Sequence, residues 1–358
     1  MLKRFARTWR FALVLVTVCL CSAISLSACG QQPTEESQDK TGNPAVAAVN
    51  SDELKVSVAF PKGASSVGMA SFASKISSGE LDVPYIMAVA GTFDQVSQAI
   101  IDERVDIAIL PPSSAAMLYN QQKGKIKVVC VNALGGAGVV TGSKKVKSIE
   151  DLAGKTVYVN DQSDSFVTVF KKILDLNGLT DEVTLEYDPN SAELAAKLKA
   201  DKKVVAVLPQ PEAAAAVAQD DRLRQAFDVS SLWDEKMVDG SRWVTGVVVV
   251  RNKFFKRHPE VVEDFLAQLE ESTEIAAKDP ITAIPLVTQA GILSEAMATE
   301  GSLPACHPVC IRGAEMRKAV SGYLQVLYDE NPASVGGLLP DGNFYYVPVE
   351  QVEESAEE

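Results

Sequence analysis

The chain contains little histidine, the side chain that enzymes use most often for acid–base chemistry. Of its 358 residues only two, His258 and His307, are histidines, and His258 precedes a proline where it is expected to flank the start of a helix. The nucleophile motif Gly-x-Ser-x-Gly is missing. The glycine-rich stretch at residues 136–142 departs by one residue from the spacing of a dinucleotide-binding loop. Histidine- or serine-based catalysis and dinucleotide binding are therefore not expected.

Positive charge is also scarce. The chain has 34 Lys and Arg residues against 47 Asp and Glu residues, which gives a formal net charge of −13 at pH 7. Neither half shows the basic stripe that would neutralise phosphates, so no nucleic-acid partner is expected. Beyond the amino terminus no run of 18 or more apolar residues occurs. The chain is therefore not expected to form a pore.

The amino terminus has the layout of a secretory signal. Basic residues precede an uncharged stretch at residues 11–28, and Leu-Ser-Ala-Cys at residues 26–29 resembles the bacterial lipobox, in which the cysteine is lipid-modified after cleavage on its amino side. An uncleaved membrane helix is the alternative, because 18 residues can just span a bilayer. The small residues before Cys29 and the polar tract after it favour cleavage. We predict a signal peptide over residues 1–28 and a palmitate-type lipid on Cys29.

A polar segment follows the predicted cleavage site. Residues 29–52 are rich in Gln, Glu, Ser, Asn and Pro and contain almost no bulky apolar side chains, which is typical of a solvated tether. Residues 351–358 form an acidic tail. Loss of the signal would change the formal charge from −13 to −17, because four basic residues are removed with it. We expect an acidic body outside the cytoplasm, attached by lipid to a bacterial cell membrane.

Three cysteines remain in the predicted folded part. Cys130 lies in an apolar run and is most simply a buried strand residue. Cys306 and Cys310 flank a His-Pro-Val tripeptide, and a bend at its proline would bring the two thiols within bonding distance in an oxidising compartment. We predict a local Cys306–Cys310 disulfide. A metal site that uses His307 is the alternative, but further ligands at a suitable spacing are missing, so no metal is predicted.

One strand–loop–helix pattern occurs twice in the chain. Residues 107–121 and 205–219 share six of fifteen aligned positions, and each segment begins with an unbroken aliphatic run, meets proline and continues as an alanine-rich stretch. Such runs are typical of parallel strands that are covered on both faces. Proline is tolerated at the first helical position, and Ser113 or Ser114 can cap the first of the two helices. The carboxyl ends of parallel strands bind ligands, so the two copies suggest two lobes whose binding edges face each other.

Alternating strand and helix patterns continue on both sides of this pair. Ser-Ile-Glu-Asp at residues 148–151 has capping-box spacing and opens a second series, in which Gly178 is expected to end a helix. We predict one lobe from residues 53–138 and 247–350 and a second from residues 139–246. The crossings, near residues 138–142 and 245–246, are expected to serve as hinges.

These motifs together resemble those of a known family. The lipobox, the tether, Leu-Lys-Val-Ser-Val-Ala-Phe at residues 54–60, Asp-Ile-Ala-Ile-Leu-Pro-Pro at residues 106–112 and Ser-Ile-Glu-Asp-Leu-Ala-Gly-Lys-Thr-Val at residues 148–157 are similar to those of substrate-binding lipoproteins of ABC importers. The most similar class takes up nitrate, sulfonates, taurine or thiamine-pyrimidine precursors. The resemblance spans about residues 54–346. It implies the type II periplasmic-binding-protein fold: two doubly wound α/β lobes joined by two crossover segments, with a ligand cleft between them.

The resemblance also implies where the ligand lies and what the protein contacts. In the family, loops at the strand ends hold the ligand, and the matching positions here are Ser65, Ser66, Gly91, Thr92, Ser113, Ser114, Ser163, Asp164, Ser165, Gln210, Trp243 and Thr245. Their hydroxyls, together with the free amides at helix starts, are donors that favour an anionic or strongly accepting group. The expected partners are the transmembrane subunits of an ABC permease and the membrane, through Cys29. A monomer without catalytic residues, cofactor or metal is expected.

Several alternatives stay open at this point. Asp161, Asp164 and Glu212 lie in the same predicted loops and no arginine does, which disfavours a doubly charged phosphate. A small polar heterocycle that stacks on Trp243 or Tyr119 fits as well as an oxyanion. Enzymes of the menaquinone pathway and pyrimidine synthases share the architecture, but the export signal argues against them. A ligand-sensing lipoprotein would have the same sequence features. In either binding role, ligand contact with both lobes is expected to shift an open–closed equilibrium.

Overall fold

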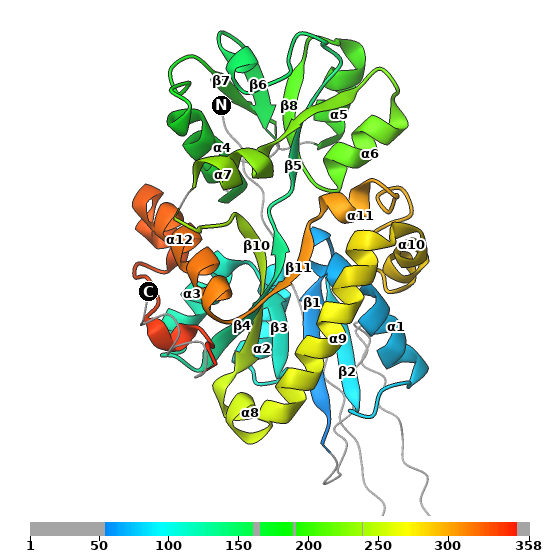
Figure 1. The fold of residues 1–358 in the computed structure, drawn as a ribbon, viewed down its shortest axis with the longest axis vertical. Coiled ribbons are helices and arrows are strands. Elements are labelled where there is room, and N and C mark those ends of the chain that lie inside the picture. Colours follow the sequence, from blue (N-terminus) through cyan, green and yellow to red (C-terminus); the bar gives the residue numbers. More distant parts are fainter. Residues whose placement is uncertain (1–53, 160–164, 189–190, 238, 349–358) are drawn as a thin grey trace, which may run out of the picture. The chain divides into compact units, whose positions relative to one another are not determined.

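A computed structural model describes residues 54–159, 165–188, 191–237 and 239–348. The described chain forms two mixed β-sheets (Figure 1), one with the strand order β11-β4-β10-β3-β1-β2 and one with the order β7-β6-β8-β5-β9. We refer to each sheet with the helices packed on it as lobe 1 and lobe 2, respectively. No helix of the described residues is long and apolar enough to cross a membrane. The two-sheet α/β architecture agrees with the predicted fold class.

Lobe 1 is built on parallel strands that are apolar on both faces. β1, β2 and β3 pair in parallel, and β10 inserts antiparallel between β3 and β4. In β3, Ile107 and Ile109 face one hydrophobic cluster, whereas Ala108 and Leu110 face the other. This two-sided burial explains the unbroken aliphatic runs in the sequence. The strands of this sheet are β1 (Val56–Pro61), β2 (Tyr85–Ala90), β3 (Ile107–Leu110), β4 (Ile126–Leu134), β10 (Val244–Arg251) and β11 (Pro308–Ile311).

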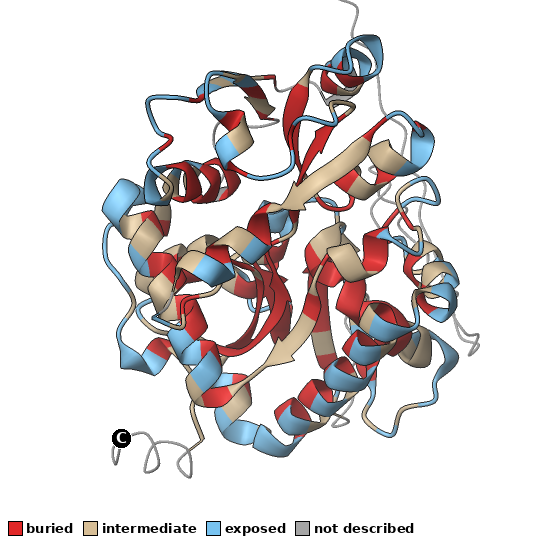
Figure 2. Ribbon diagram, turned by 45° about the horizontal axis from the view of Figure 1, so that its top comes forward, coloured by how far each residue is buried: buried red, intermediate tan, exposed pale blue. Residues whose placement is uncertain are grey.

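Helices cover both faces of this sheet. One layer, which contains α1 and α9, packs on the side of Phe60 and Ile107, and Phe72 and Phe265 meet edge to face in it. The other layer contains α2, α3 and α12. Buried residues are concentrated in the strands and on the inner sides of these helices (Figure 2). The helical segments of lobe 1 are η1 (Ala64–Met69), α1 (Ala70–Ser78), α2 (Phe93–Ile101), α3 (Pro112–Gln121), α8 (Asn252–Arg257), α9 (Pro259–Lys278), α10 (Pro280–Gln289), α11 (Ser302–Ala305), α12 (Gly313–Glu330), η3 (Pro332–Val335) and η4 (Gly342–Phe344).

Lobe 2 repeats this construction on a smaller scale. β6 pairs in parallel with β7 and β8, and β5 is antiparallel to β8 and β9. Val205 and Val207 face the side of α4 and α7, whereas Ala206 and Leu208 face α5 and α6. The elements are β5 (Ala137–Thr141), η2 (Glu150–Leu152), β6 (Thr156–Val159), α4 (Ser165–Leu176), β7 (Thr184–Tyr187), α5 (Ser191–Ala200), β8 (Val205–Pro209), α6 (Glu212–Gln219), β9 (Arg224–Asp228) and α7 (Val229–Lys236).

The duplicated segment forms the predicted strand–loop–helix unit in each lobe. β3 with α3 is the first copy and β8 with α6 is the second. Pro112 occupies the first helical position of α3, as predicted, but the expected serine cap is wrong: Pro111 is the cap residue and no side chain caps this helix. The helix starts two residues earlier than a cap at Ser113 would require, because proline already has the backbone angle of a helix start. Gly178, with a φ of +69°, follows the end of α4 as predicted.

Two connections carry the chain between the lobes. It leaves lobe 1 through Gly135 and Gly136, between β4 and β5, and returns between α7 and β10. A Cβ atom on Gly135 would lie 1.9 Å from the Trp243 ring, so only glycine fits where the outgoing chain passes the returning one. The lobes also pack directly, since Trp233 of α7 meets Tyr323 of α12 at a centroid distance of 6.0 Å. Of the expected hinge residues, 138–141 lie within β5 and 245–246 lie within β10, and Gly142 directly follows β5, so none of them lies between the sheets.

Candidate functional site

A cavity of about 270 Å³ is lined by residues of both lobes. Its walls come from the carboxyl ends of the parallel strands and from the two connecting segments, which is where open α/β sheets bind ligands. Lobe 1 supplies the larger share of the wall, and lobe 2 faces it from the other side. The lining residues are, from lobe 1, Lys62, Gly63, Ala64, Ser65, Phe93, Pro111, Pro112, Leu134, Trp243, Val244, Thr245 and Cys306, and from lobe 2, Gly136, Phe166, Pro209 and Gln210.

Five helical segments begin at this cavity. Each follows a parallel strand, namely β1, β2, β3, β6 or β8, and a residue within two positions of the start of each segment lines the cavity. The first amides of a helix have no partner inside the helix, and the helix dipole places partial positive charge at that end. Helix starts from both lobes face this one small cavity. They therefore favour a ligand that carries negative charge or strong hydrogen-bond acceptors.

Among the described residues, Lys62 is the one charged residue that lines the cavity. It lies in the loop between β1 and η1, and its backbone amide donates to the Ala90 carbonyl (3.0 Å), while the Gly63 amide donates to Ile292 (3.0 Å). These bonds hold the loop between two neighbouring segments of lobe 1. The exposed side chain of Lys62 can therefore bring a positive charge to the mouth of the cavity from a fixed backbone position.

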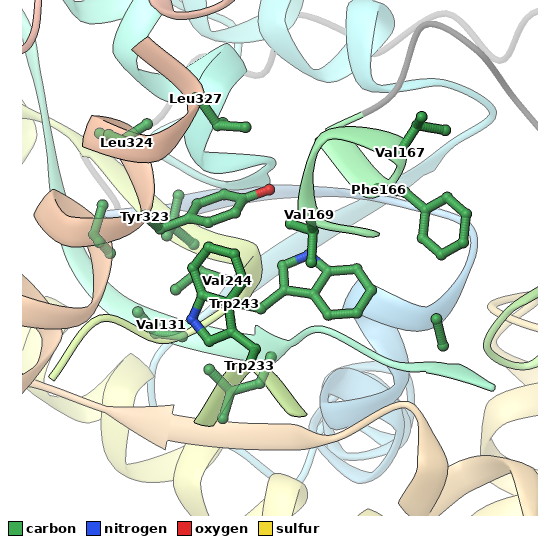
Figure 3. Packing of buried hydrophobic residues seen from close by; sticks show 14 of the residues in the cluster. Val131, Phe166, Val167, Val169, Trp233, Trp243, Val244, Tyr323, Leu324 and Leu327 are labelled. Atoms are coloured by element: carbon green, nitrogen blue, oxygen red, sulfur yellow. The ribbon is translucent and has the colours of Figure 1, made fainter. Parts of the chain in front are cut away.

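Trp243 and Phe166 form an apolar wall shared by the two lobes. Their rings lie 6.0 Å apart and are tilted by 37° (Figure 3), and Trp243 is only 3 % exposed. The indole N–H of Trp243 is fully buried and has no acceptor among the described residues. The cavity therefore meets the indole ring, not its N–H group. The Gly135 amide donates to the Trp243 carbonyl at 2.6 Å, which couples this wall to the outgoing connection.

Gln210 is the polar side chain that lobe 2 contributes to the cavity. It follows β8, where the aligned position of the first copy is Pro112. Its side-chain oxygen accepts from the Ala214 amide (3.1 Å), and its side-chain nitrogen donates to the Gln225 side chain (3.1 Å). Gln210 thus satisfies one of the free amides of α6 and is held from two sides.

Four of the predicted site residues line the cavity: Ser65, Gln210, Trp243 and Thr245. Ser65 is nearly buried at the start of η1. The Thr245 hydroxyl donates to the Leu134 carbonyl at 2.8 Å, so it stabilises the end of β4.

The other predicted site residues lie elsewhere or outside the described part of the chain. Ser66 is fully buried and donates to the Pro61 carbonyl (2.6 Å), and Thr92 accepts from the Gln95 amide as the cap of α2. Gly91, Ser113 and Ser114 are also absent from the cavity wall. Residues 163 and 164 lie outside the described residues, and Ser165 is described only as the first residue of α4. Tyr119, expected to stack on a ligand, instead donates to Asp341 (2.7 Å) away from the cavity.

Sequence reasoning missed Lys62, Phe93, Phe166 and Cys306. Phe93 and Phe166 each lie one residue beyond a predicted position, at Thr92 and Ser165. The signal that could have found them is the helix start itself, because side chains in the first turn of a helix point back toward its amino-terminal end and so toward the strand that precedes it. Lys62 lies just before Ser65 and Ser66, whose hydroxyls make them the predicted donors at this strand end.

The structure has no bond between Cys306 and Cys310, and both residues are free thiols, so the predicted disulfide is not formed in it. Cys306 ends α11 and lines the cavity, whereas Cys310 lies within the extended strand β11. Pro308 begins this strand instead of making a tight bend, and an extended strand advances about 3.3 Å per residue, which carries Cys310 away. Cys130 is a fully buried strand residue, as predicted. Burial and the nearby Glu212 charge raise the pKa of Cys306 to about 12.

Two further observations bear on the choice of site. A larger cavity, of about 620 Å³, is lined by residues of α4, β7 and α12, including Lys171, Asp175 and Glu330, but neither the sheet of lobe 1 nor the two connections between the lobes contribute to its lining. We therefore regard the smaller cavity as the site. Among the described residues no group of three or more His, Cys, Asp or Glu side chains is arranged to hold a metal ion.

A sequence model of one protein family matches residues 66–283, and its description reads ABC transporter, phosphonate, periplasmic substrate-binding protein. The chain belongs to this family. As a member it is an extracytoplasmic substrate-binding protein of an ABC transporter, which agrees with the class that its motifs resemble. A comparison with curated protein sequences gives no match.

Solved structures agree with the family assignment. An ABC transporter protein from Parabacteroides distasonis is 25% identical, with a TM-score of 0.68 over 83% of this chain and 99% of its own. The periplasmic aliphatic sulphonate binding protein SsuA from Escherichia coli is 14% identical (TM-score 0.61; 82% and 92% covered). A putative sulfonate-binding protein from Methylobacillus flagellatus is 16% identical (TM-score 0.58; 86% and 96% covered). The last two share the fold with this chain.

Proposed function

We propose that this substrate-binding protein captures a small organic oxyanion, of the phosphonate or sulfonate class, between its two lobes and delivers it to the transmembrane subunits of an ABC permease. The observation that carries the proposal is the set of five helical segments that begin at one cavity. Thr92 and Gln210 accept from one first-turn amide each in α2 and α6. The remaining uncapped amides and the dipoles match an oxyanion, which needs several donors converging from different directions.

The size and charge of the cavity support a compact anion. A volume of about 270 Å³ is just below the range of about 300–1,000 Å³ that is typical of small-molecule sites, so it suits a compact ligand. Lys62 supplies a positive charge at the mouth of the cavity. Of the three acidic residues that disfavour a double charge, Glu212 does not line the cavity, and Asp161 and Asp164 lie outside the described residues. Trp243, Phe93 and Phe166 would contact the organic part of the ligand.

The mechanism we propose is closure of the lobes around the ligand. Because both lobes line the cavity, a ligand gains its full set of contacts only when they approach each other, and it shifts the open–closed equilibrium by this difference in affinity. The glycines at the outgoing connection are suitable hinge positions. The closed form would be the one that the permease recognises.

The proposal keeps the predicted organisation of the chain. It includes cleavage after residue 28, a lipid on Cys29, a tether at residues 29–52, an acidic tail and a monomeric body. It also keeps the lobes at residues 53–138 with 247–350 and at residues 139–246. Sheet membership supports these boundaries to within a few residues, since β5 starts at Ala137 and β10 at Val244. All residues before Leu54 lie outside the described part of the chain.

We propose a binding role instead of an enzymatic one. Cys306 is the nucleophilic side chain that lines the cavity besides the hydroxyls of Ser65 and Thr245, and its raised pKa, about 12, keeps it protonated near neutral pH. A protonated thiol is a poor nucleophile. Neither His258 nor His307 lines the cavity to act as its base.

Calorimetry with matched ligands tests the proposal. Methanesulfonate and methylphosphonate are compared with methanesulfonamide, a neutral molecule of nearly the same shape as the sulfonate, and with nitrate and a neutral pyrimidine. We expect at least one of the two oxyanions to bind and the sulfonamide to bind at least tenfold more weakly. Binding of the pyrimidine or the sulfonamide without the oxyanions would refute the proposed ligand class.

A further inference from the structure

Two cysteines that are far apart in the sequence meet in lobe 1. Cys130 lies in β4 and Cys310 lies in β11, 180 residues later, and their Sγ atoms are 3.4 Å apart. The two strands are antiparallel neighbours at one end of the six-stranded sheet. Both side chains belong to the same hydrophobic cluster, on the face covered by α9. The third thiol, Cys306, lines the ligand cavity instead.

We propose that Cys130 and Cys310 form a disulfide bond in the exported protein. The bond would need the sulfur atoms to approach from 3.4 Å to about 2.05 Å, which small rotations of two side chains on neighbouring strands can provide. The family places the chain outside the cytoplasm, where disulfides form and persist. The inference rests on this location and not on the identity of the ligand.

The two thiols differ in pKa and in exposure, and this difference determines which of them reacts first. Burial raises the pKa of Cys130, whereas the hydrogen bond from Cys130 lowers the pKa of Cys310, which is also the more exposed of the pair. The Cys310 thiolate would attack a disulfide of an oxidising thiol–disulfide exchange protein and displace one of its thiolates. Cys130 would then lose its proton and attack Cys310 Sγ, which releases the second thiolate. Two protons and two electrons pass to the oxidant.

The bond would strengthen a weak part of the sheet. β11 is an end strand that pairs with β4 at only two positions, Pro308 with Ala133 and Ile311 with Val131, and the register shifts between them. The chain directly before β11 carries Cys306 into the cavity wall, and the end of β4 leads into the connection to lobe 2. A covalent link between these strands would hold that side of the cavity to the sheet while the lobes move.

Peptide mapping of the full-length protein, exported to an oxidising compartment, tests the proposal. Free thiols are alkylated in denaturant without reductant, and the protein is digested and analysed by mass spectrometry. We expect the Cys130 and Cys310 peptides to be joined, two hydrogens lighter than their sum, and Cys306 to be alkylated. A Cys306–Cys310 link would overturn the proposal. Alkylated Cys130 and Cys310 would also overturn it if they persist after the native protein is equilibrated with oxidised glutathione.

Cysteine-to-serine variants test the proposal through thermal stability and hydrogen exchange, in addition to direct detection of the bond. Cys306→Ser should leave the link intact, and Cys310→Ser should leave Cys130 open to alkylation. The link closes a long loop, so reduction should lower the Tm of the parent protein by about 5–10 °C and leave that of Cys310→Ser unchanged. Hydrogen exchange at residues 308–311 should become faster on reduction. An equal Tm shift in both proteins would argue against the link.

Discussion

The two walls of the cavity are built by the same strand–loop–helix unit, but they offer a ligand different side-chain chemistry. In lobe 1 the duplicated unit ends in Pro111 and Pro112, which contribute no polar side chain, and the charge comes from Lys62 on a neighbouring loop. In lobe 2 the position aligned with Pro112 is Gln210, whose side chain bonds to α6 and to Gln225. The repeated unit therefore positions the walls, while single loop residues decide what each wall can bind. We infer that lobe 1 provides most of the affinity.

The largest effect should follow from removing the apolar side of the lobe 1 wall. Trp243 is nearly buried and packs on Phe166 of lobe 2, so Trp243→Ala should lower the free energy of unfolding by about 3–5 kcal/mol. Trp243→Phe, which keeps a ring, should lose much less. Urea unfolding measures both variants. A loss below about 1 kcal/mol for the alanine variant would mean that the lobes do not share this wall in solution.

Removing the charge of the lobe 1 wall should affect binding without affecting stability. Because a hydrogen bond to a charged group contributes about 1.5–3 kcal/mol, Lys62→Gln should weaken oxyanion binding by about 10- to 100-fold. Lys62 is exposed, so the Tm should stay the same. Lys125→Gln, on an exposed side chain that does not line the cavity, is the control for net charge. Equal affinities of the two variants by calorimetry would remove Lys62 from the site.

The polar group of the lobe 2 wall should have a smaller effect. Gln210→Ala breaks a bond to the Ala214 amide and a bond to Gln225, and it should cost about 1 kcal/mol of stability together with a several-fold loss of ligand affinity. A double-mutant cycle with Gln225→Ala isolates the second bond. A coupling energy near zero would show that the bond contributes nothing. Affinity that falls more than in Lys62→Gln would reverse the ranking of the walls.

The smallest effect should be a pH dependence that originates in lobe 2. Burial raises the pKa of Glu212 at the start of α6, so its proton is held more tightly in the folded protein than in the unfolded chain. The resulting stability is fully present below the ordinary glutamate pKa and is lost as the pH rises through the raised value. Glu212→Gln should flatten the Tm–pH profile in that window and raise the Tm above it. Parallel profiles of variant and parent would refute this assignment.

Local patterns were sufficient for the elements that position the site. The aliphatic runs followed by proline identified β3 with α3 and β8 with α6, and Gly178 identified the end of α4. These signals are local because backbone conformation depends mainly on neighbouring residues. Local patterns were not sufficient to identify which side chains line the cavity. Thr92 was selected as a donor, but it caps α2, and its neighbour Phe93 lines the cavity.

The sequence by itself determined the family, the α/β class, the repeated strand–loop–helix unit and the edge of each sheet at which the cavity lies. Each of these depends on short runs of residues or on one sequence motif, such as residues 148–157. Only the tertiary structure decided that Lys62, Phe166 and Cys306 line one cavity, and that Cys310 meets Cys130 instead of Cys306. The reason is physical: which side chains face each other across two lobes or two strands depends on sheet order and register, and these are set by contacts between residues that are far apart in the chain.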